Sequence, residues 1–484
     1  MAKSITKNII YNLLFQVVTL VLPLVTLPYV SRVLGANGVG IYSYTSSITQ
    51  YFILFGTLGL AMYGNRQIAY MRDNKEDMSR AFWSILLLRM CTTGFAAILY
   101  ITIFIHTKMY NDIYMIQALT IISAMLDISW LYMGLEDFKK IVSRNIIIKI
   151  LGVFLIFIFI KSYEDLGLYI FINAATLLLG NAVMWIYLPK TVSKVRIKFN
   201  DILINIIPSI RLFIPQIAIQ IYLVLDKTFL GLLSNVTEVG YYEQSEKIVK
   251  ATLAVVTVLG IVMMPRMSNL YANGDKEKMN DYLNISLKGV TYVSIPMFIG
   301  LIGVANEFVP WFFGDDFNKI KYLIPMLSPI LYFIALSSVM GTQYLLPANR
   351  IKEYSRSVSI GAIVNIVLNI ILIPQYGAIG TCIGTVVAEF TVTAIQYKYL
   401  RNEIVKRDYA KCVINFTVAS LIMLVPVRLI GVELGATMFT TFIQIIVGFI
   451  VYILLLKIFQ DSFNDLIIGK IRGVVVKHFY NTTP

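Results

Sequence analysis

Residues 39–44 read VGIYSY and residues 239–244 read VGYYEQ, so nearly the same phrase occurs twice at an offset of 200. That offset is too long for the modules of about 20 to 50 residues that build tandem-repeat proteins. Loop residues repeat at a similar distance: KEDM at 75–78 matches KEKM at 276–279, and YEDLG at 163–167 matches YGAIG at 376–380. The chain is therefore predicted to contain two similar halves, residues 1–200 and 201–408. Chance similarity between apolar segments is the alternative, and the matches at charged positions count against it.

The composition is that of a chain solvated by lipid. Of the 484 residues, 58% are hydrophobic and 14% are charged, and the mean hydropathy is +0.74. Water-soluble cores cannot bury so large an apolar fraction. Stretches such as SILLLRMCTTGFAAILYITIF at 84–104 reach the length of about 20 residues that a helix needs to cross a bilayer. About fourteen such stretches predict an all-α polytopic membrane protein, because membrane strands would alternate in polarity instead.

Lysine and arginine are divided unequally between the two sides of the predicted membrane. Threading fourteen spans places 29 of the 41 on the side of both termini and 6 on the other side. Positively charged loops stay cytoplasmic. We therefore expect a cell-membrane protein with both termini in the cytoplasm. The net charge of +14 is then a topology signal, and no nucleic-acid partner is expected.

The repeat and the spans together predict an architecture. Each half contains an even number of spans, six, so both halves enter the membrane in the same direction. Parallel repeats of this kind form the two lobes of many alternating-access transporters, with the site between them. Residues 409–458 then supply helices 13 and 14, and residues 459–484 form a cytoplasmic tail.

Several motifs, taken in order, resemble one transporter family. They are SRVLGANGVGIYSY at 31–44, VLDKTFLG at 224–231, VGYYEQSEKIVK at 239–250, FFGDDF at 312–317 and YGAIGTCIGTVVAE at 376–389. Together they resemble the polysaccharide-transporter branch of the MOP exporter superfamily, the Wzx-type flippases. The resemblance implies a V-shaped bundle of two six-helix lobes plus two extra helices, and a substrate of sugars on a polyprenyl diphosphate. SRVLG also resembles the related lipid II flippases, which implies that Arg32 lies near the central cavity. The glycines of GANGVG at 35–40 are read as a tight turn rather than a phosphate loop.

Two ionisable residues are predicted to meet inside the first half. Arg89 and Asp127 lie 19 positions before and after residue 108, where helices 3 and 4 turn back as a hairpin. They should therefore lie at the same depth. A charge inside a span costs about 2.5 to 3.5 kcal/mol on insertion scales, so it faces protein or a water-filled cavity. A structural ion pair and a cavity function are both open.

Four further charged residues are candidates. Asp226 and Lys227 lie in helix 7; because neighbours on a helix point about 100° apart, they cannot pair with each other, and Lys227 is assigned to the cavity. In helix 8, Glu246 and Lys250 have the stabilising i,i+4 spacing, and Lys250 is added to the cavity cations. Glu389, near the middle of helix 12, is either a protonatable coupling site or a buried carboxyl. Histidines and cysteines lack metal-ligand spacing, so no metal site is expected.

These residues favour an anionic substrate. The cavity cations Arg32, Arg89, Lys227 and Lys250 suit a diphosphate, and the function expected is a flippase that moves a polyprenyl-diphosphate-linked oligosaccharide outward by alternating access. A multidrug or cation antiporter of the same superfamily is an alternative, although helix 1 has no acidic residue. A lipid II or teichoic-acid-unit flippase is another. An oligosaccharide polymerase or acyltransferase would need catalytic groups on an exposed loop, and no enzyme is expected.

No cofactor is expected, since the chain has no GxxxxGK[ST] nucleotide loop. The driving force stays open between a Na⁺ gradient, an H⁺ gradient and the membrane potential, with Asp127, Asp226 and Glu389 as the residues for ion coupling or buried pairing. The partners expected are the lipid-linked oligosaccharide, membrane lipids and the proteins that polymerise and assemble the polysaccharide.

Overall fold

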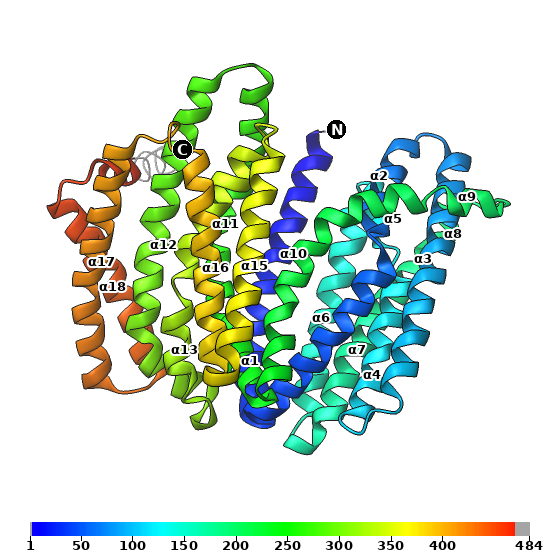
Figure 1. Ribbon diagram of the computed structural model, residues 1–484, viewed down its shortest axis with the longest axis horizontal. Helices are drawn as coiled ribbons and strands as arrows, with labels where there is room; N and C mark the ends of the chain where they lie inside the picture. Colours follow the sequence, from blue (N-terminus) through cyan, green and yellow to red (C-terminus); the bar gives the residue numbers. More distant parts are fainter. Residues whose placement is uncertain (1, 470–484) are drawn as a thin grey trace, which may run out of the picture. The chain divides into compact units, whose positions relative to one another are not determined.

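The computed structural model describes the backbone of residues 2–469. It also describes their side chains, except those of residues 2–18, 20–21, 214–216, 218–219, 221–223 and 258–262. Within this range all regular structure is helical, which confirms the predicted all-α class (Figure 1). Ten helical segments from Lys75 onward are long and apolar enough to cross a membrane. The other four predicted spans fall in three helices whose side chains are only partly described.

The chain divides into two compact units, Met1–Gly240 and Tyr241–Pro484. The main helices of the first unit are α1 (Ala2–Thr57), α2 (Leu60–Met71), α3 (Lys75–Phe104), α4 (Asn111–Leu126), α5 (Ser129–Gly134), α6 (Phe138–Phe159), α7 (Leu166–Met184), α8 (Leu188–Thr191), α9 (Phe199–Leu203) and α10 (Ile206–Leu233). This spatial division places α10 with the first unit. The boundary near residue 200 is predicted from sequence similarity between two halves, which is a different criterion, and it stays a prediction.

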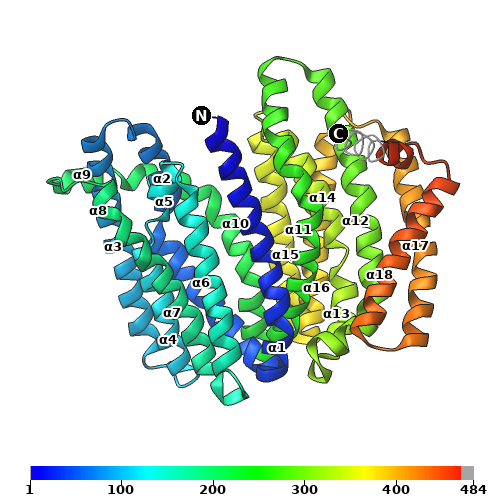
Figure 2. The same ribbon diagram turned by 180° about the vertical axis from the view of Figure 1, so that it is seen from behind.

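The second unit begins within α11. Its helices are α11 (Val236–Ala272), α12 (Lys276–Phe313), α13 (Ile320–Leu327), α14 (Ile330–Ser337), the π-helix η4 (Ser338–Leu345), α15 (Ile351–Tyr376), α16 (Ala378–Tyr399), α17 (Lys406–Leu434) and α18 (Met438–Ile458). In this unit α12 lies between α17 and α16 (Figures 1 and 2). It packs against α17, α18 and α14, and α14 packs in turn against α16.

The turn predicted at GANGVG is confirmed, and it is confined to one residue. Gly35 has φ 63° and ψ 177°, whereas residues 36–57 are helical again. A positive φ of this kind is readily adopted only by glycine. The first two predicted spans are therefore joined by a single bend inside α1.

The repeated segments around VG at 39–40 and VG at 239–240 contact each other within the first unit. A Cβ atom added to Gly40 would lie 1.7 Å from the carbonyl oxygen of Val236, and one added to Gly240 would lie 1.9 Å from that of Ala36. Between them, Asn37 Nδ2 donates to Thr237 Oγ1 at 3.2 Å. Each of these contacts joins residues that are about 200 positions apart, and the contact of Gly40 with Val236 mirrors that of Gly240 with Ala36. The repeated glycines are required because two backbones touch there.

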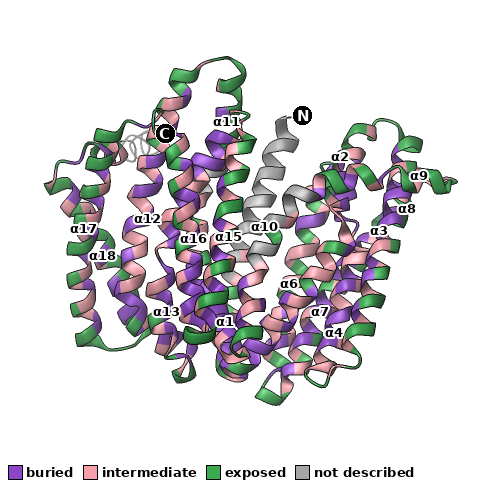
Figure 3. Ribbon diagram, viewed as in Figure 1, coloured by how far each residue is buried: buried purple, intermediate pink, exposed green. Residues whose placement is uncertain are grey.

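The outer surfaces of the spans are apolar. Exposed residues run along α17 and α18 (Figure 3), and they include Leu429 at 61%, Val432 at 71% and Phe449 at 67% exposure. So continuous an apolar surface is not tolerated in water and fits a helix bundle that lipid solvates. Behind it, the α12, α17 and α18 core is formed by residues such as Phe416 and Leu456, which are fully buried.

The beginning of the predicted cytoplasmic tail is also packed. Residues 462–469 form a further helical segment. It is capped by Asp461, whose Oδ1 accepts hydrogen bonds from the backbone N–H groups of Phe463 and Asn464, both at 3.1 Å. Phe463 belongs to the α12, α17 and α18 core. The segment after α18 therefore returns to the bundle rather than leaving it at once.

Candidate functional site

The predicted contact between Arg89 and Asp127 is confirmed. Arg89 Nη2 lies 3.4 Å from Asp127 Oδ2, and the Arg89 side chain is only 3% exposed. Asp127 lies within the candidate span Asn111–Gly134, at a break in the helix: α4 ends at Leu126 and Asp127 is extended, with φ −71° and ψ 111°. Its Oδ1 instead accepts the backbone N–H of Ser129 at 2.9 Å, at the start of α5. Aspartate favours this local bond over a helical backbone.

The break after α4 explains why Arg89 is there. Its Nε and Nη2 donate to the carbonyl oxygen of Ala124 at 2.9 and 2.8 Å. The last carbonyls of a helix lack intrahelical partners and carry partial negative charge, and neighbouring side chains must satisfy them inside a membrane. Asn181 and Trp185 do so as well, by donating to the carbonyl oxygens of Ser123 at 3.0 Å and Leu126 at 2.8 Å. The guanidinium of Arg89 is thus held by a helix end as well as by a carboxylate.

The charged pair of α10 lies at the packing surface with α1. Asp226 is buried and Lys227 is half-buried, each with partners in the fold. The next residue, Thr228, joins the two helices: its hydroxyl lies 2.9 Å from that of Ser47 and 3.1 Å from that of Tyr51. Arg32 is exposed and precedes the bend of α1 by three residues. Their roles toward substrate stay predictions.

In the second unit, the pair predicted on α11 is confirmed, because Lys250 Nζ lies 2.6 Å from Glu246 Oε1. One turn earlier on the same helix, Lys247 Nζ lies 2.9 Å from Glu243 Oε1 with the same spacing. Both glutamates are buried, whereas the Lys250 side chain is 42% exposed. The ammonium of Lys250 therefore has a carboxylate partner and an open side. Glu389 is half-buried in α16, and its coupling role stays a prediction.

Sequence reasoning missed Lys149, which lies in the middle of α6. It is the twelfth of the 22 residues of this helix, and its Nζ donates to Thr19 Oγ1 of α1 at 3.1 Å. The signal was available: between Arg144 and Lys161 it is the only charged residue in a run of apolar ones. A lysine at this depth is a functional candidate by default.

A partly buried ion pair in the second unit was also missed. Arg428 Nη1 of α17 lies 3.1 Å from Glu307 Oε2 of α12, and Gln444 Nε2 of α18 donates to the same carboxylate oxygen at 3.1 Å. A Cβ atom on Gly431 would lie 2.5 Å from the carboxyl carbon of Glu307. The glycine therefore makes room for the pair, which joins three helices.

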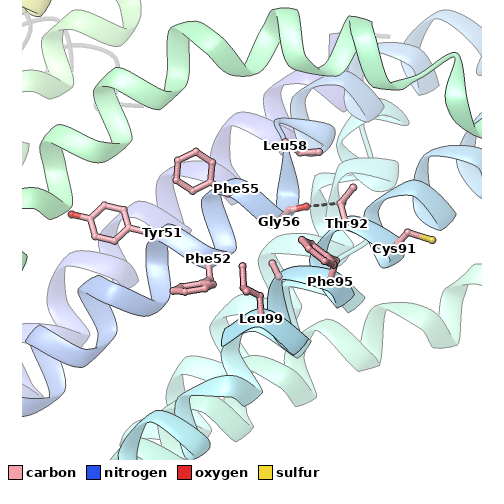
Figure 4. A pocket seen from close by; sticks show the side chains of 10 residues that line it. Tyr51, Phe52, Phe55, Gly56, Leu58, Cys91, Thr92, Phe95 and Leu99 are labelled. Atoms are coloured by element: carbon pink, nitrogen blue, oxygen red, sulfur yellow. Dashed lines mark hydrogen bonds between the residues drawn. The ribbon is translucent and has the colours of Figure 1, made fainter. Parts of the chain in front are cut away.

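The first unit also has an apolar groove, of about 650 Å³, between the end of α1 and α3. Phe52 and Phe55 line it from α1, and Phe95 and Leu99 line it from α3 (Figure 4). At one end Thr92 donates to the carbonyl oxygen of Gly56 at 2.7 Å. The walls can hold aliphatic groups and offer almost no polar atom to a head group. In the part of the chain that the structure describes, no cluster of histidine, cysteine or acidic residues could hold a metal ion.

Comparisons with known proteins agree on the fold and family. Residues 5–271 match the family model described as polysaccharide biosynthesis protein. A protein of Escherichia coli strain K12 named "Putative O-antigen transporter" is 24% identical over 405 residues, which are 82% of this chain and 97% of that protein. The solved structure titled "Lipid II flippase MurJ, inward closed conformation" has a TM-score of 0.73 at 18% identity, over 94% of this chain and all of that one.

A more distant likeness is to a multidrug transporter. The outward-facing structure of a multidrug resistance MATE family transporter of the MOP superfamily has a TM-score of 0.52 at 12% identity, over 83% of this chain and 95% of that one. At these identities both structures inform on the fold alone. The family model, in contrast, covers more than half of the sequence. The chain belongs to the polysaccharide biosynthesis protein family.

Proposed function

We propose that the protein is a flippase that carries a polyprenyl-diphosphate-linked oligosaccharide from the cytoplasmic to the outer leaflet, for the synthesis of a cell-surface polysaccharide. The observation that carries this function is the family match over residues 5–271. It is supported by the similarity of 82% of the chain to a protein named as an O-antigen transporter and by the fold shared with a lipid II flippase. All three concern membrane transport of lipid-linked sugars or the synthesis of polysaccharides.

The membrane orientation is part of the proposal. Both termini lie in the cytoplasm, because 29 lysines and arginines lie on their side and 6 on the other. The substrate then enters from the side on which its sugars are assembled. The proteins that polymerise and export the polysaccharide are the expected neighbours on the outer side.

The diphosphate needs cations within the spans, and the chain offers a small set. Arg32, Lys149 and Lys227 lie in the first unit, and Lys250 lies in the second. Lys149 is the strongest addition, since it stands at mid-helix inside a predicted span, where its Nζ donates to Thr19 Oγ1 at 3.1 Å. Arg89 contributes less to substrate binding in this scheme, because α4 and Asp127 already engage its guanidinium.

The deciding experiment is deletion of the gene followed by analysis of polyprenyl-linked sugars. We expect a completed oligosaccharide unit to accumulate on the cytoplasmic face, and the wild-type gene to restore export. A strain that exports its surface polysaccharide normally, with no such accumulation, would contradict the proposal. Accumulation of lipid II would instead identify the alternative of a lipid II flippase.

The antiporter alternative concerns another class of transporter with the same type of fold. A cation exporter would protect cells from cationic drugs. The same deletion strain should therefore be tested for drug sensitivity. We expect unchanged sensitivity, because the charged candidates on the helices of the first unit are mostly cations.

A further inference from the structure

A second groove lies in the second unit. It has a volume of about 510 Å³, within the range of ligand sites, and it separates α16 from α17 above a floor formed by α12, α14 and η4. The positions of α16, α12 and α17 can be followed in Figures 1 and 2. Met340 of the floor belongs to the π-helix η4, and such helices are frequent at functional sites.

The groove is apolar along its length and charged at one end. From α17 it is lined by Lys406, Tyr409, Val413 and Ile414, whose spacing of three, four and one places them on one face of the helix. Lys406 is the first residue of α17, so its ammonium stands at the helix end and the apolar residues follow inward. A ligand that fits this wall has a charged head and an aliphatic body.

The opposite wall also has a polar residue at the end near Lys406 and apolar residues further in. From α16 the groove is lined by Phe390, Thr393 and Tyr397, and Tyr397 lies in the last turn of that helix. Deeper in, Phe390 packs edge-on against Phe333 of the floor, with ring centroids 5.4 Å apart. The tyrosine therefore marks the same end as Lys406, and the aromatic contact closes the apolar end. Tyrosines at helix ends commonly mark the membrane–water interface.

The charged end is held rigidly. Asn284 of α12 donates to the carbonyl oxygen of Glu403 at 3.0 Å and accepts the backbone N–H of Val405 at 2.9 Å. Arg350 Nη1 lies 3.1 Å from Glu403 Oε1. These bonds fix the segment that leads into Lys406. They also neutralise the carboxylate of Glu403, and Lys406 makes no ion pair with any residue that the structure describes.

A cluster of hydroxyls completes the wall below the lysine. The Tyr409 hydroxyl lies 3.1 Å from that of Thr291 and 3.2 Å from that of Tyr332. Residues 398–411 contain five lysines and arginines against two acidic residues. This surplus is on the side that the lysine and arginine distribution assigns to the cytoplasm, where anionic lipids attract basic segments next to the membrane.

We propose that this groove is a binding site for an anionic phospholipid of the cytoplasmic leaflet. The lipid phosphate lies at Lys406, and one acyl chain runs between α16 and α17 toward Ile414. Charge complementarity selects an anionic head group over a zwitterionic one, and the apolar length between the helices selects a lipid over a free anion.

The test uses the purified full-length protein, stripped of lipid in detergent and titrated with phosphatidylglycerol or phosphatidylcholine while native mass spectrometry counts bound lipid. We expect phosphatidylglycerol to bind more tightly. Lys406→Gln should weaken it by about fivefold, the effect of one basic residue at an anionic surface, and should leave phosphatidylcholine unchanged. The matched control is Lys411→Gln, five residues further along the same helix and not in the lining of the groove.

A second variant tests the apolar part. Ala410→Trp fills the groove from α17 and should remove the tightly bound lipid of either kind, with the unfolding temperature as a check on folding. Equal binding of the two lipids by the wild type would overturn the proposal, as would an equal effect of Lys406→Gln and Lys411→Gln. Retention of a polyprenyl phosphate in preference to phosphatidylglycerol would reassign the groove to the substrate.

Discussion

The paired arginines of the first unit differ in what holds them. Arg89 is enclosed by a carboxylate and a helix end, whereas Arg72, near the end of α2, pairs with Glu136 at 2.9 Å with 42% of its side chain exposed. Removing one partner of a buried pair leaves an uncompensated charge. Exposed pairs contribute about 0 to 1 kcal/mol. Two pairs of the same type should therefore respond very differently to substitution.

The first prediction is a double-mutant cycle at the buried pair. Arg89→Ala and Asp127→Ala should each destabilise the protein, by about 3 to 5 kcal/mol for the arginine. The arginine variant should lose more, because the carbonyl oxygen of Ala124 also loses its donors. The double variant should lose less than the sum. The free energy of unfolding of the wild type, the two single variants and the double variant is measured by denaturant unfolding in detergent.

The control for this cycle is Arg72→Ala, which should change stability by less than about 1 kcal/mol. Additive losses at Arg89 and Asp127 would mean that the contact at 3.4 Å has no energetic weight of its own.

A second prediction concerns Lys149. Lys149→Ala should reduce flipping of the lipid-linked substrate in reconstituted vesicles, while the amount of folded protein stays nearly the same. Lys149→Arg should retain more activity than Lys149→Glu, because an anionic diphosphate responds to the sign of the charge. Lys161→Ala, at an exposed position beyond the end of the same helix, is the control. Equal activity of the arginine and glutamate variants would remove Lys149 from the substrate pathway.

At the scale of the helices, the backbones of α1 and α11 approach each other closely at the repeated glycines Gly40 and Gly240. Gly40→Ala places a methyl group 1.7 Å from the carbonyl oxygen of Val236, so the two segments must separate. We expect a clear loss of folded protein, measured by size-exclusion chromatography and by the unfolding temperature. Gly300→Ala in α12 is the matched control, because nothing lies within 4 Å of its added Cβ atom. Alanine there should be neutral or stabilising by up to about 1 kcal/mol. Equal behaviour of the two variants would refute the close contact.

Local pattern predicted some helical features and could not predict others. The spans follow from runs of apolar residues, and the Glu246–Lys250 pair follows from i,i+4 spacing, because both are properties of one helix. The depth argument found the Arg89 contact because a hairpin fixes the register of its two arms. The break at Asp127 depends on donors from α3 and on the indole of Trp185. Such partners come from other parts of the fold, so no local pattern announces them.

For the whole molecule, the first expectation is its orientation. A reporter fused at Asn74, between α2 and α3, should read cytoplasmic, and one fused at Asp315, directly after α12, should read external. The reason is the distribution of 29 against 6 basic residues between the two sets of loops. The reverse pair of results would overturn the sidedness, and with it the assignment of the lipid groove to the cytoplasmic leaflet.

The driving force is the second expectation at this scale. Outward movement of a diphosphate carries about two negative charges, and a potential of ~100 mV contributes about 2.3 kcal/mol per charge. Without a compensating ion, the potential alone would favour export by about 4.6 kcal/mol. Collapsing the potential in sealed vesicles, with no ion gradient, should therefore slow flipping. A rate that ignores the potential and follows Na⁺ or H⁺ would direct attention to Asp226 and Glu389.

The reciprocal contact of Ala36 and Gly40 with Val236 and Gly240 has the form that identical subunits adopt around a two-fold axis, where residue i meets j and j meets i. A patch of this form couples the two segments sterically, because each backbone limits the side-chain volume that the other can accept. A bulkier residue in one copy is accommodated only by a change in the other, so substitutions at residues 36–40 and 236–240 should be fixed in pairs. The similarity of the two segments is therefore maintained by the steric limits that each places on the other.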